Sequence, residues 1–461
     1  MALPRIDIGL AREERLPAIL LVIFFITLCI AGGASREDVL AQSVVRGVAV
    51  VLMCIRIVTR GLPDLKVYRA LSYLLAAMGI LTALQLVPLP PSIWTALPGR
   101  GTIASLPLPP TMWRPINLVP DAGWNSLFSL LVPFCVLVLV SALGQNTVRR
   151  TYLIVLGAIV FSAVLALLQA AGTAPDNPLI NGSTTDYAGV FANRNHQALF
   201  LSIGIALTWH WGFENGGHLR DRRLWLAFCL IFLMGISILA TGSRAGILLG
   251  GLALVLGPAV ALLNRRSSGG LGLRRAVIWS GGMIVFVAII GLTSLYFGRA
   301  ESFTRATTMT VDSDFRIRAL PVVWDIAKGY FPFGAGMGSF DAVFRAAEPL
   351  ALLEPTYFNH AHNDLLETVI ETGMFGPVIA GCAAIWLGLG SIRAFADRSQ
   401  AARLARFGSL TVILVVIASI SDYPARTPMI MALIMISGCW LSMASVPQTA
   451  RNALRATPDP L

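Results

Sequence analysis

Long runs of apolar residues, separated by short polar segments, are the dominant pattern along this chain. An α-helix needs about 20 predominantly apolar residues to cross a hydrocarbon core of about 30 Å. Runs of that kind predict an all-α, polytopic membrane protein with about 12 transmembrane helices. The predicted spans cover residues 16–34, 39–58, 70–88, 125–144, 151–172, 196–213, 224–241, 245–263, 276–297, 374–395, 405–421 and 428–446. The second is the weakest, because Arg46 lies within it.

Composition supports the same fold class. Only 13% of the 461 residues are charged, whereas a soluble domain carries about 25%. Hydrophobic residues make up 56% of the chain, which excludes a single soluble fold, and we treat residues 1–461 as one integral membrane domain. The first span also fits a signal peptide, since Arg12 and Arg15 precede it and small residues end it. Cleavage there would leave the orientation of the later spans unchanged.

Basic residues predict the orientation of the spans, because Lys and Arg in short loops stay on the cytoplasmic side. If the N-terminus is cytoplasmic, 22 of the 35 basic residues fall in inner loops or at inner span ends. Both termini are therefore predicted to be cytoplasmic. The net charge of +11 then reflects membrane topology, and we do not expect nucleic-acid binding.

Two predicted outer segments are too long for simple turns. Residues 88–124 are rich in Pro and Trp, which suits an irregular layer at the headgroups. Residues 298–373 form the larger segment, with ten acidic and six basic residues, and loops of that length usually have structure or function of their own. Apolar residues at helical spacing predict an amphipathic helix on the membrane surface at 316–328. A second helix is predicted from about 362 to 372, ending at Gly373.

The membrane interior carries few polar groups. None of the 24 Asp and Glu residues lies in the middle of a predicted span. Proton or cation relays normally need carboxylates or histidines there, so a transporter of small anions or lipid-linked sugars is the weaker, non-enzymatic alternative. Four strong polar side chains lie away from the span ends, and we expect them to bind neighbouring helices. They are Gln42, Arg46, Gln85 and Gln169.

The predicted outer face gathers most of the candidate chemistry. Its candidate residues are Arg194, Arg244, Arg316, His360, His362, Asp422 and Arg426. Arg244 follows Thr241-Gly242-Ser243 in a turn that joins two spans with almost no loop. That turn combines a guanidinium, two hydroxyls and the free amides of a helix N-terminus, which together suit an anion such as a phosphate. The alternative is an arginine that snorkels to the lipid headgroups, and it applies equally to Arg194.

The run His360-Ala361-His362-Asn363 allows three interpretations. A zinc site would need a third ligand, and the spare ligands are His196 and scattered acids. A histidine that caps or packs a helix is the structural alternative. The third is a general base, because histidine titrates near neutral pH and nearby arginines favour its neutral form. Clustered arginines with one histidine point to a lipid-linked diphosphate and a hydroxyl as substrates, which implies glycosyl transfer.

A longer motif carries a family resemblance. His362-Asn363, nine further residues and then Gly373-Met374-Phe375-Gly376 resemble the signature of O-antigen ligases. The chain is similar to the O-antigen ligase and O-antigen polymerase superfamily of bacterial inner membranes over roughly residues 85–440. Supporting segments lie at 189–196, 241–244 and 330–340.

The resemblance implies a metal-independent, inverting glycosyltransferase without a cofactor. Its donor would be an undecaprenyl-diphosphate-linked glycan, and its acceptor would be lipid A core in a ligase or a lipid-linked repeat in a polymerase. We favour the ligase, hence a role in lipopolysaccharide biosynthesis, with an O-antigen or exopolysaccharide polymerase as the alternative. The implied location is the inner membrane, in contact with membrane lipids, with residues 298–373 and the active site facing the periplasm.

The resemblance also assigns roles to individual residues. His362 would be the catalytic base. Arg244 and Arg316 would bind the donor diphosphate, with Arg194 as a third contact. Arg318 is the alternative to Arg316, which we prefer because it follows Asp312-Ser313-Asp314. His360 and Asn363 would support their neighbour His362, and no metal ligand is expected.

Overall fold

Helices make up nearly all of the regular structure that the computed structural model describes. It describes residues 11–36, 39–101, 109, 111–173, 177, 179–180, 187–214, 222–263, 281–282, 311–354, 358–397 and 399–444. Within these ranges the only sheet pairs two short antiparallel strands, β1 (Pro88–Leu89) and β2 (Arg114–Pro115). The all-α, polytopic fold class is therefore confirmed.

Helices occupy eleven of the twelve predicted spans within the described residues. They are α1 (Arg12–Ala31), α2 (Leu40–Arg60), α3 (Arg69–Gln85), α6 (Pro120–Ser129), α7 (Leu131–Val140), α9 (Tyr152–Ala170), α10 (Arg194–Phe213), α11 (Arg222–Thr241), α12 (Arg244–Leu262), α18 (Phe375–Ala396), α19 (Gln400–Ala418) and α20 (Pro428–Ala444). Eight of the helices described are long and apolar enough to cross a membrane. The span at 276–297 lies outside the described residues except for 281–282, so the count of twelve and the orientation stay predictions.

The span predicted at 125–144 differs from expectation. The structure has two consecutive helices there, α6 and α7, which meet at Leu130. Pro133 explains the break, because it has no N–H to donate and its ring crowds the carbonyl of Ser129, the last residue of α6. All six cysteines are free, and Cys54, Cys229 and Cys382 are exposed.

Helices α10 and α12 pack closely along their length. A Cβ added at Gly246 would come within 2.3 Å of Ala198 Cβ, and one at Gly257 within 2.5 Å of the Trp209 ring. Small residues at such positions let two backbones approach each other. Because Gly246 and Ala198 both lie in first turns, the starting residues of the two helices, Arg194 and Arg244, lie at the same end of this pair.

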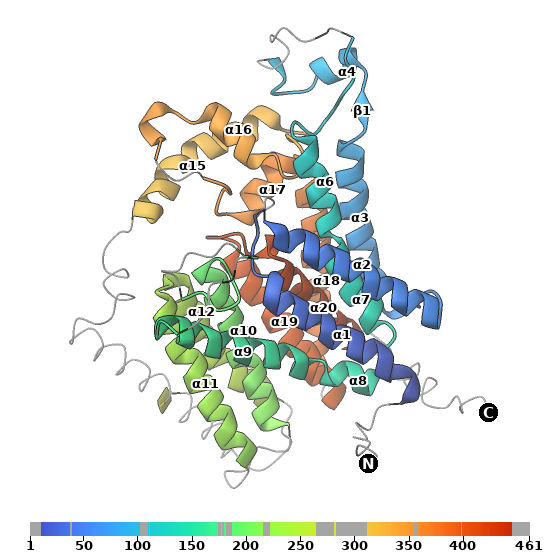
Figure 1. Ribbon diagram of the computed structural model, residues 1–461, viewed down its shortest axis with the longest axis vertical. Coiled ribbons are helices and arrows are strands. Elements are labelled where there is room, and N and C mark those ends of the chain that lie inside the picture. The colour runs from blue at the N-terminus through green and yellow to red at the C-terminus, as the bar shows by residue number, and fades with distance from the viewer. Residues whose placement is uncertain are drawn as a thin grey trace.

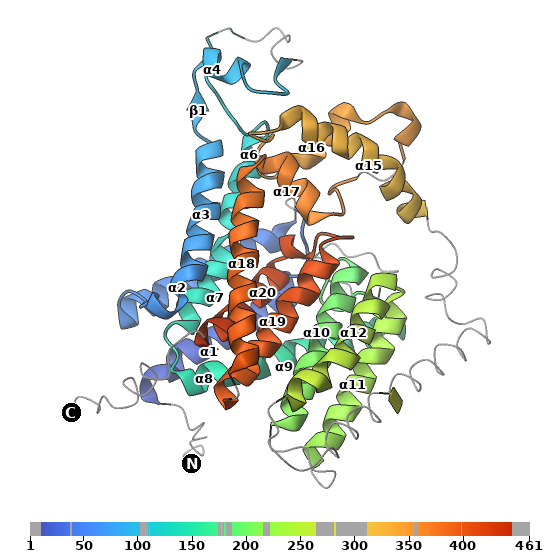
Figure 2. The same ribbon diagram turned by 180° about the vertical axis from the view of Figure 1, so that it is seen from behind.

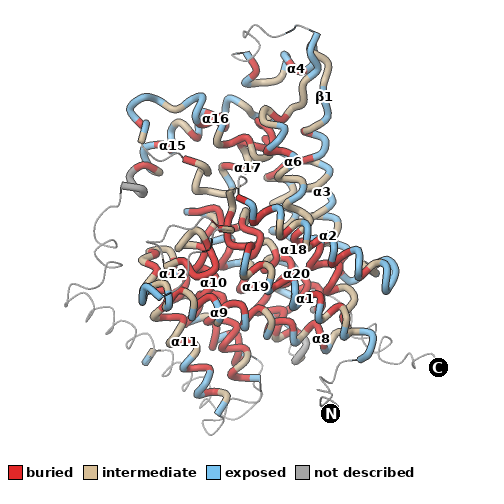
Figure 3. Tube along the Cα trace, in the orientation of Figure 1, coloured by how far each residue is buried: buried red, intermediate tan, exposed pale blue. Residues whose placement is uncertain are grey.

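Residues 311–354 and 358–372 of the segment predicted as an outer loop form a layer beside the ends of the bundle helices (Figures 1 and 2). This layer contains α15 (Val311–Tyr330), α16 (Phe340–Ala347), a short 3-10 turn η2 (Leu350–Leu352) and α17 (Asp364–Thr372). The helices expected at 316–328 and 362–372 are thus present. Ala319, Val323 and Ala327 of α15 are buried in the layer, whereas Leu320 and Trp324 are exposed. The buried positions of the whole molecule are drawn in Figure 3.

Gly373 ends α17 as predicted. It has φ +59°, and a Cβ there would lie 1.9 Å from the carbonyl oxygen of Pro332. The neighbouring Met374 donates its N–H to the same oxygen at 2.9 Å. A side chain at 373 would therefore separate α17 from the glycine-rich segment that follows α15, which gives this signature glycine a structural reason.

The remaining elements are short connections. They are η1 (Lys66–Tyr68), α4 (Pro91–Thr95), α8 (Gln145–Arg150) and η3 (Pro424–Arg426). The polar side chains expected to bind neighbouring helices do bind other parts of the chain. Arg46 donates to Asn125 Oδ1 at 2.7 Å, and Gln85 Nε2 donates to the carbonyl oxygen of Glu371 at 2.9 Å.

Candidate active site

His362 is held with one ring nitrogen free to accept a proton. Its Nδ1 lies 2.8 Å from the carbonyl oxygen of His360. A carbonyl oxygen only accepts hydrogen bonds, so Nδ1 carries the proton and the lone pair is on Nε2. The ring stacks on Phe358 with a centroid distance of 4.9 Å and meets Tyr423 edge-on at 5.0 Å.

The surroundings of His362 favour the neutral imidazole. Burial and, after it, the positive charge of Arg316 lower the pKa of His362 to about 4. Asp422 opposes this shift but does not outweigh it. An unperturbed histidine has a pKa of about 6.5 and is partly protonated near neutral pH. His362 is therefore almost entirely in the form that accepts a proton.

Arg316 rather than Arg318 faces the turn next to His362. Arg316 Nη1 donates to the carbonyl oxygen of Ser421 at 3.2 Å. Arg318 points elsewhere, donating to the carbonyl oxygen of Ala351 at 2.8 Å and lying 3.7 Å from a carboxylate oxygen of Glu354. The geometry thus favours the choice of Arg316 over Arg318.

Residues 419–421 also anchor the signature motif through main-chain oxygens. The Asp364 N–H donates to the Ser419 oxygen at 3.0 Å, and Asn363 Nδ2 donates to the Ile420 oxygen at 3.0 Å. Asn363 Oδ1 in turn accepts from the N–H of Leu366 and caps α17. Asn363 therefore positions the start of the helix that follows His362.

Asp422 connects the histidines to the start of α10. Asn195 Nδ2 donates to its carboxylate at 2.8 Å, and His196 Nε2 lies 3.9 Å from it. Burial alone would raise the pKa of Asp422, but His196, His362 and Arg316 together lower it. Asp422 is thus a buried anion at the centre of the candidate site. The sequence marked it as an outer-face residue without a role.

Arg194 and Arg244 are the first residues of α10 and α12. Each helix is capped by the residue before it: Asn193 Oδ1 accepts from the N–H of Asn195, and Ser243 Oγ accepts from the N–H of Gly246 at 2.9 Å. Arg194 thereby lies next to Asn195, which binds Asp422. The arginine-bearing helix ends and the His362 turn therefore occupy one region of the fold.

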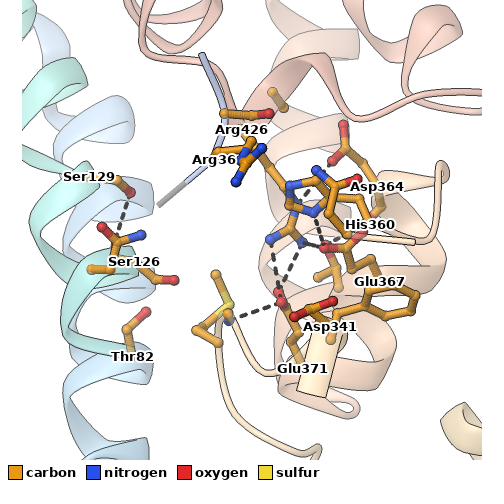
Figure 4. A pocket seen from close by; sticks show the side chains of 18 of the residues that line it. Arg36, Thr82, Ser126, Ser129, Asp341, His360, Asp364, Glu367, Glu371 and Arg426 are labelled. Atoms are coloured by element: carbon orange, nitrogen blue, oxygen red, sulfur yellow. Dashed lines mark hydrogen bonds and ion pairs between the residues drawn. The ribbon is translucent and has the colours of Figure 1, made fainter. Parts of the chain in front are cut away.

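A second cluster, the carboxylate cluster, surrounds Arg426 (Figure 4). It consists of Asp364, Glu367 and Glu371, which lie on one face of α17. Arg426 lies 2.9 Å from Glu371, 3.3 Å from Glu367 and 3.5 Å from Asp364, measured between side-chain nitrogen and oxygen atoms. His360 Nδ1 is 2.7 Å from Glu367 Oε1. The spacing i, i+3, i+7 could have revealed the carboxylate face, but nothing in the sequence pointed to Arg426 as its partner.

The carboxyl groups of this cluster differ in protonation. Burial alone would raise the pKa of Glu367, but Arg426 and His360 outweigh it and lower that pKa to about 2. Burial prevails at Asp364 and raises its pKa to about 6, despite Arg426. Glu367 is therefore a firm anion, while Asp364 titrates just below neutral pH.

A polar cavity of about 470 Å³ adjoins the carboxylate cluster. Figure 4 shows Thr82, Ser126 and Ser129 facing the cluster from the opposite side. His360 lines the cavity, whereas His362 is not among its lining residues. In the part of the chain that the structure describes, no three His, Cys, Asp or Glu side chains are grouped to hold a metal ion.

Part of the chain is similar to a known protein family. Residues 229–381 match the family described as O-Antigen ligase. The chain is thus similar to O-antigen ligases over about a third of its length. The resemblance carried by the His362 signature is therefore confirmed.

The superfamily match covers part of the candidate site. Arg244, Arg316 and His362 lie inside the matched segment, whereas Arg194 and Asp422 lie outside it. A curated relative is the exopolysaccharide production protein ExoQ of Rhizobium meliloti (strain 1021). It is 25% identical over 261 residues, which cover 53% of this chain and 54% of that protein. The match thus spans about half the length of the relative.

Proposed function

We propose that this protein transfers a glycan from a lipid-linked diphosphate to a hydroxyl group of an acceptor. Undecaprenyl diphosphate is the proposed carrier, and the periplasmic face of a bacterial inner membrane is the proposed location. The observation that carries the proposal is His362, whose Nε2 is free and whose pKa is lowered to about 4, beside Arg316. The match of residues 229–381 to the O-antigen ligase family supports a glycan as the group transferred.

The chemistry follows from these groups. Nε2 of His362 accepts the proton of the acceptor hydroxyl while that oxygen forms a bond to the anomeric carbon of the donor. The bond between the anomeric carbon and the diphosphate oxygen breaks, and the electron pair leaves with the lipid diphosphate. Arg244, Arg316 and Arg194 stabilise the developing charge without a metal ion. Attack from the side opposite the leaving group inverts the anomeric configuration, and His362 releases its proton to water.

Two acceptors are compatible with this chemistry. We favour lipid A core, hence an O-antigen ligase, because the signature at His362 and the matched family are those of ligases. The second candidate is a polymerase that extends lipid-linked repeats. The name of ExoQ, an exopolysaccharide production protein, favours it.

Surface polysaccharide from a strain lacking this gene distinguishes these functions. We expect core-linked ladders to disappear on a gel while long glycans accumulate on the lipid carrier. Single repeats that remain on the core would instead identify a polymerase. If neither the surface glycan nor the lipid-linked pool changes, the transferase proposal is wrong.

Arg316→Ala is expected to lower glycan transfer by roughly 10²–10³-fold, because one fixed positive charge on the leaving diphosphate is lost. Arg318→Ala, on the same helix, is the matched control, and we expect turnover within about threefold of wild type because exposed ion pairs contribute little. Steady-state rates with purified full-length protein measure both. Equal losses in the two variants would show that Arg316 has no special role.

A further inference from the structure

The polar cavity beside the carboxylate cluster has no role in the chemistry described so far. It lies between α2, α3 and α6 on one side and α17 with residues 337–345 on the other. Among its lining residues are none of the three arginines assigned to the donor diphosphate. The cavity is therefore distinct from the site assigned to the donor diphosphate.

The lining alternates hydrogen-bond donors with acceptors. Arg46 donates to the side-chain oxygens of Asn125 and Gln42 at the wall formed by α2 and α6. Ser126 and Ser129 add hydroxyls, and the carboxylate cluster supplies acceptors opposite them. Sugar hydroxyls donate and accept in the same way. Arginines and carboxyl groups both line the cavity, so sugar hydroxyls find charged as well as neutral hydrogen-bond partners there.

The cavity is coupled to His362 through two residues. His360 lines the cavity, and its carbonyl oxygen accepts the Nδ1 proton of His362. Tyr423 contacts both rings, with centroid distances of 4.2 Å to His360 and 5.0 Å to His362. A sugar unit in the cavity would therefore lie next to the unit whose hydroxyl meets His362.

We propose that this cavity is a subsite for the acceptor saccharide, and that it binds the sugar unit adjacent to the one that reacts. This proposal rests on the proposed function. It adds the part of the protein that recognises the acceptor, which is the cavity between α2, α3, α6 and α17. The volume of the cavity is within the range of about 300–1,000 Å³ usual for ligand pockets. The same chemistry fits sugars of a core lipid and sugars of a lipid-linked repeat.

The test fills the cavity from α6. Ser126→Trp adds a large side chain to the cavity, and Ser129→Leu adds a smaller one. Phe128→Trp is the matched control, because it enlarges a side chain that is 48% exposed on the same helix. Purified full-length variants are assayed with lipid-linked glycan donor extracted from a strain lacking the gene. Core lipid and lipid-linked single repeats from that strain serve as the two acceptors.

We expect both serine variants to raise the KM for the acceptor by roughly tenfold or more, since even one extra methylene in a hydrophobic pocket alters selectivity by about 10–200-fold. The KM for the donor should stay within about twofold, which also shows that the variants are folded. The acceptor whose KM rises identifies the source of the saccharide. Phe128→Trp should behave as wild type.

Three results would overturn the proposal. An unchanged acceptor KM in Ser126→Trp and Ser129→Leu would show that the cavity is not an acceptor subsite, while transfer itself stands. A raised donor KM with an unchanged acceptor KM would assign the cavity to the donor glycan. If wild-type protein transfers glycan to neither acceptor, the proposed function fails and the subsite with it.

Discussion

His362→Asn is expected to lower the turnover number for glycan transfer by roughly 10²–10⁴-fold, the usual contribution of a general base. Asparagine removes the imidazole but tolerates the left-handed backbone at this position, where φ is +51°. Folding should therefore be preserved, and the melting temperature in detergent should stay close to that of wild type. Turnover and melting temperature of the purified protein measure the two effects separately.

His362→Gly is the control for a purely structural role. Glycine adopts positive φ without strain, whereas alanine does not. If His362 served only the backbone turn, His362→Gly would be fully active and His362→Ala would be the damaged variant. We expect glycine and asparagine to be equally inactive.

The pH profile provides an independent check on His362. A histidine with a pKa of about 6.5 would be about 90% protonated at pH 5.5 and could not accept a proton. Burial and Arg316 lower the pKa of His362 to about 4, so transfer should persist at pH 5.5 and fall only as the pH approaches 4. Half-maximal activity near pH 6.5 would contradict the assignment.

Arg426→Leu is expected to lower the free energy of unfolding by about 3–5 kcal/mol, since it leaves the buried carboxylate cluster without its cation. Arg426 lies within 3.5 Å of all three carboxyl groups, and the side chains of Glu367 and Glu371 are fully buried. Thermal unfolding of full-length protein in detergent measures the loss. Lys328→Leu is the control: its ion pair with Asp325 is exposed, so the change should be within about 1 kcal/mol.

The pH dependence of stability should change with Arg426. In wild type the pKa of Glu367 is lowered to about 2, so its contribution is present above about pH 4.3 and lost only as the pH falls toward 2. Burial raises the pKa of Asp364 to about 6, so its contribution is present below about pH 3.9 and lost as the pH rises through 6. Without Arg426 burial raises every carboxyl pKa in the cluster. The variant should therefore lose stability more steeply than wild type between pH 5 and pH 8, and parallel profiles would contradict this account.

Hydropathy predicted most of the fold because membrane helices are defined by length and apolar composition. The span predicted at 125–144 corresponds to the candidate membrane span Pro120–Val140, in which a single proline divides the helix into α6 and α7. The helices α15 and α17 were also predictable, since both combine apolar periodicity with a clear end, Gly373 in the case of α17.

The site was only partly predictable, because its contacts join segments far apart in the chain. His362 and Arg316 were identified from the motif and its neighbours. Asp422 and Arg426 gained their significance only from the fold, which brings them to Asn195 and to the face of α17. Sequence spacing gives neighbours along one helix, whereas these partners are separated by 55 residues or more.

The turn at 419–421 binds Asp364, Asn363 and Arg316 through its main-chain oxygens. A main-chain carbonyl is present whatever the side chain is, so residues 420 and 421 are free to vary among related proteins without losing these three anchors. Insertion or deletion of one residue would move all three oxygens at once. The site therefore depends on the length of this turn more than on its composition, and a comparison of residue identities alone would overlook it.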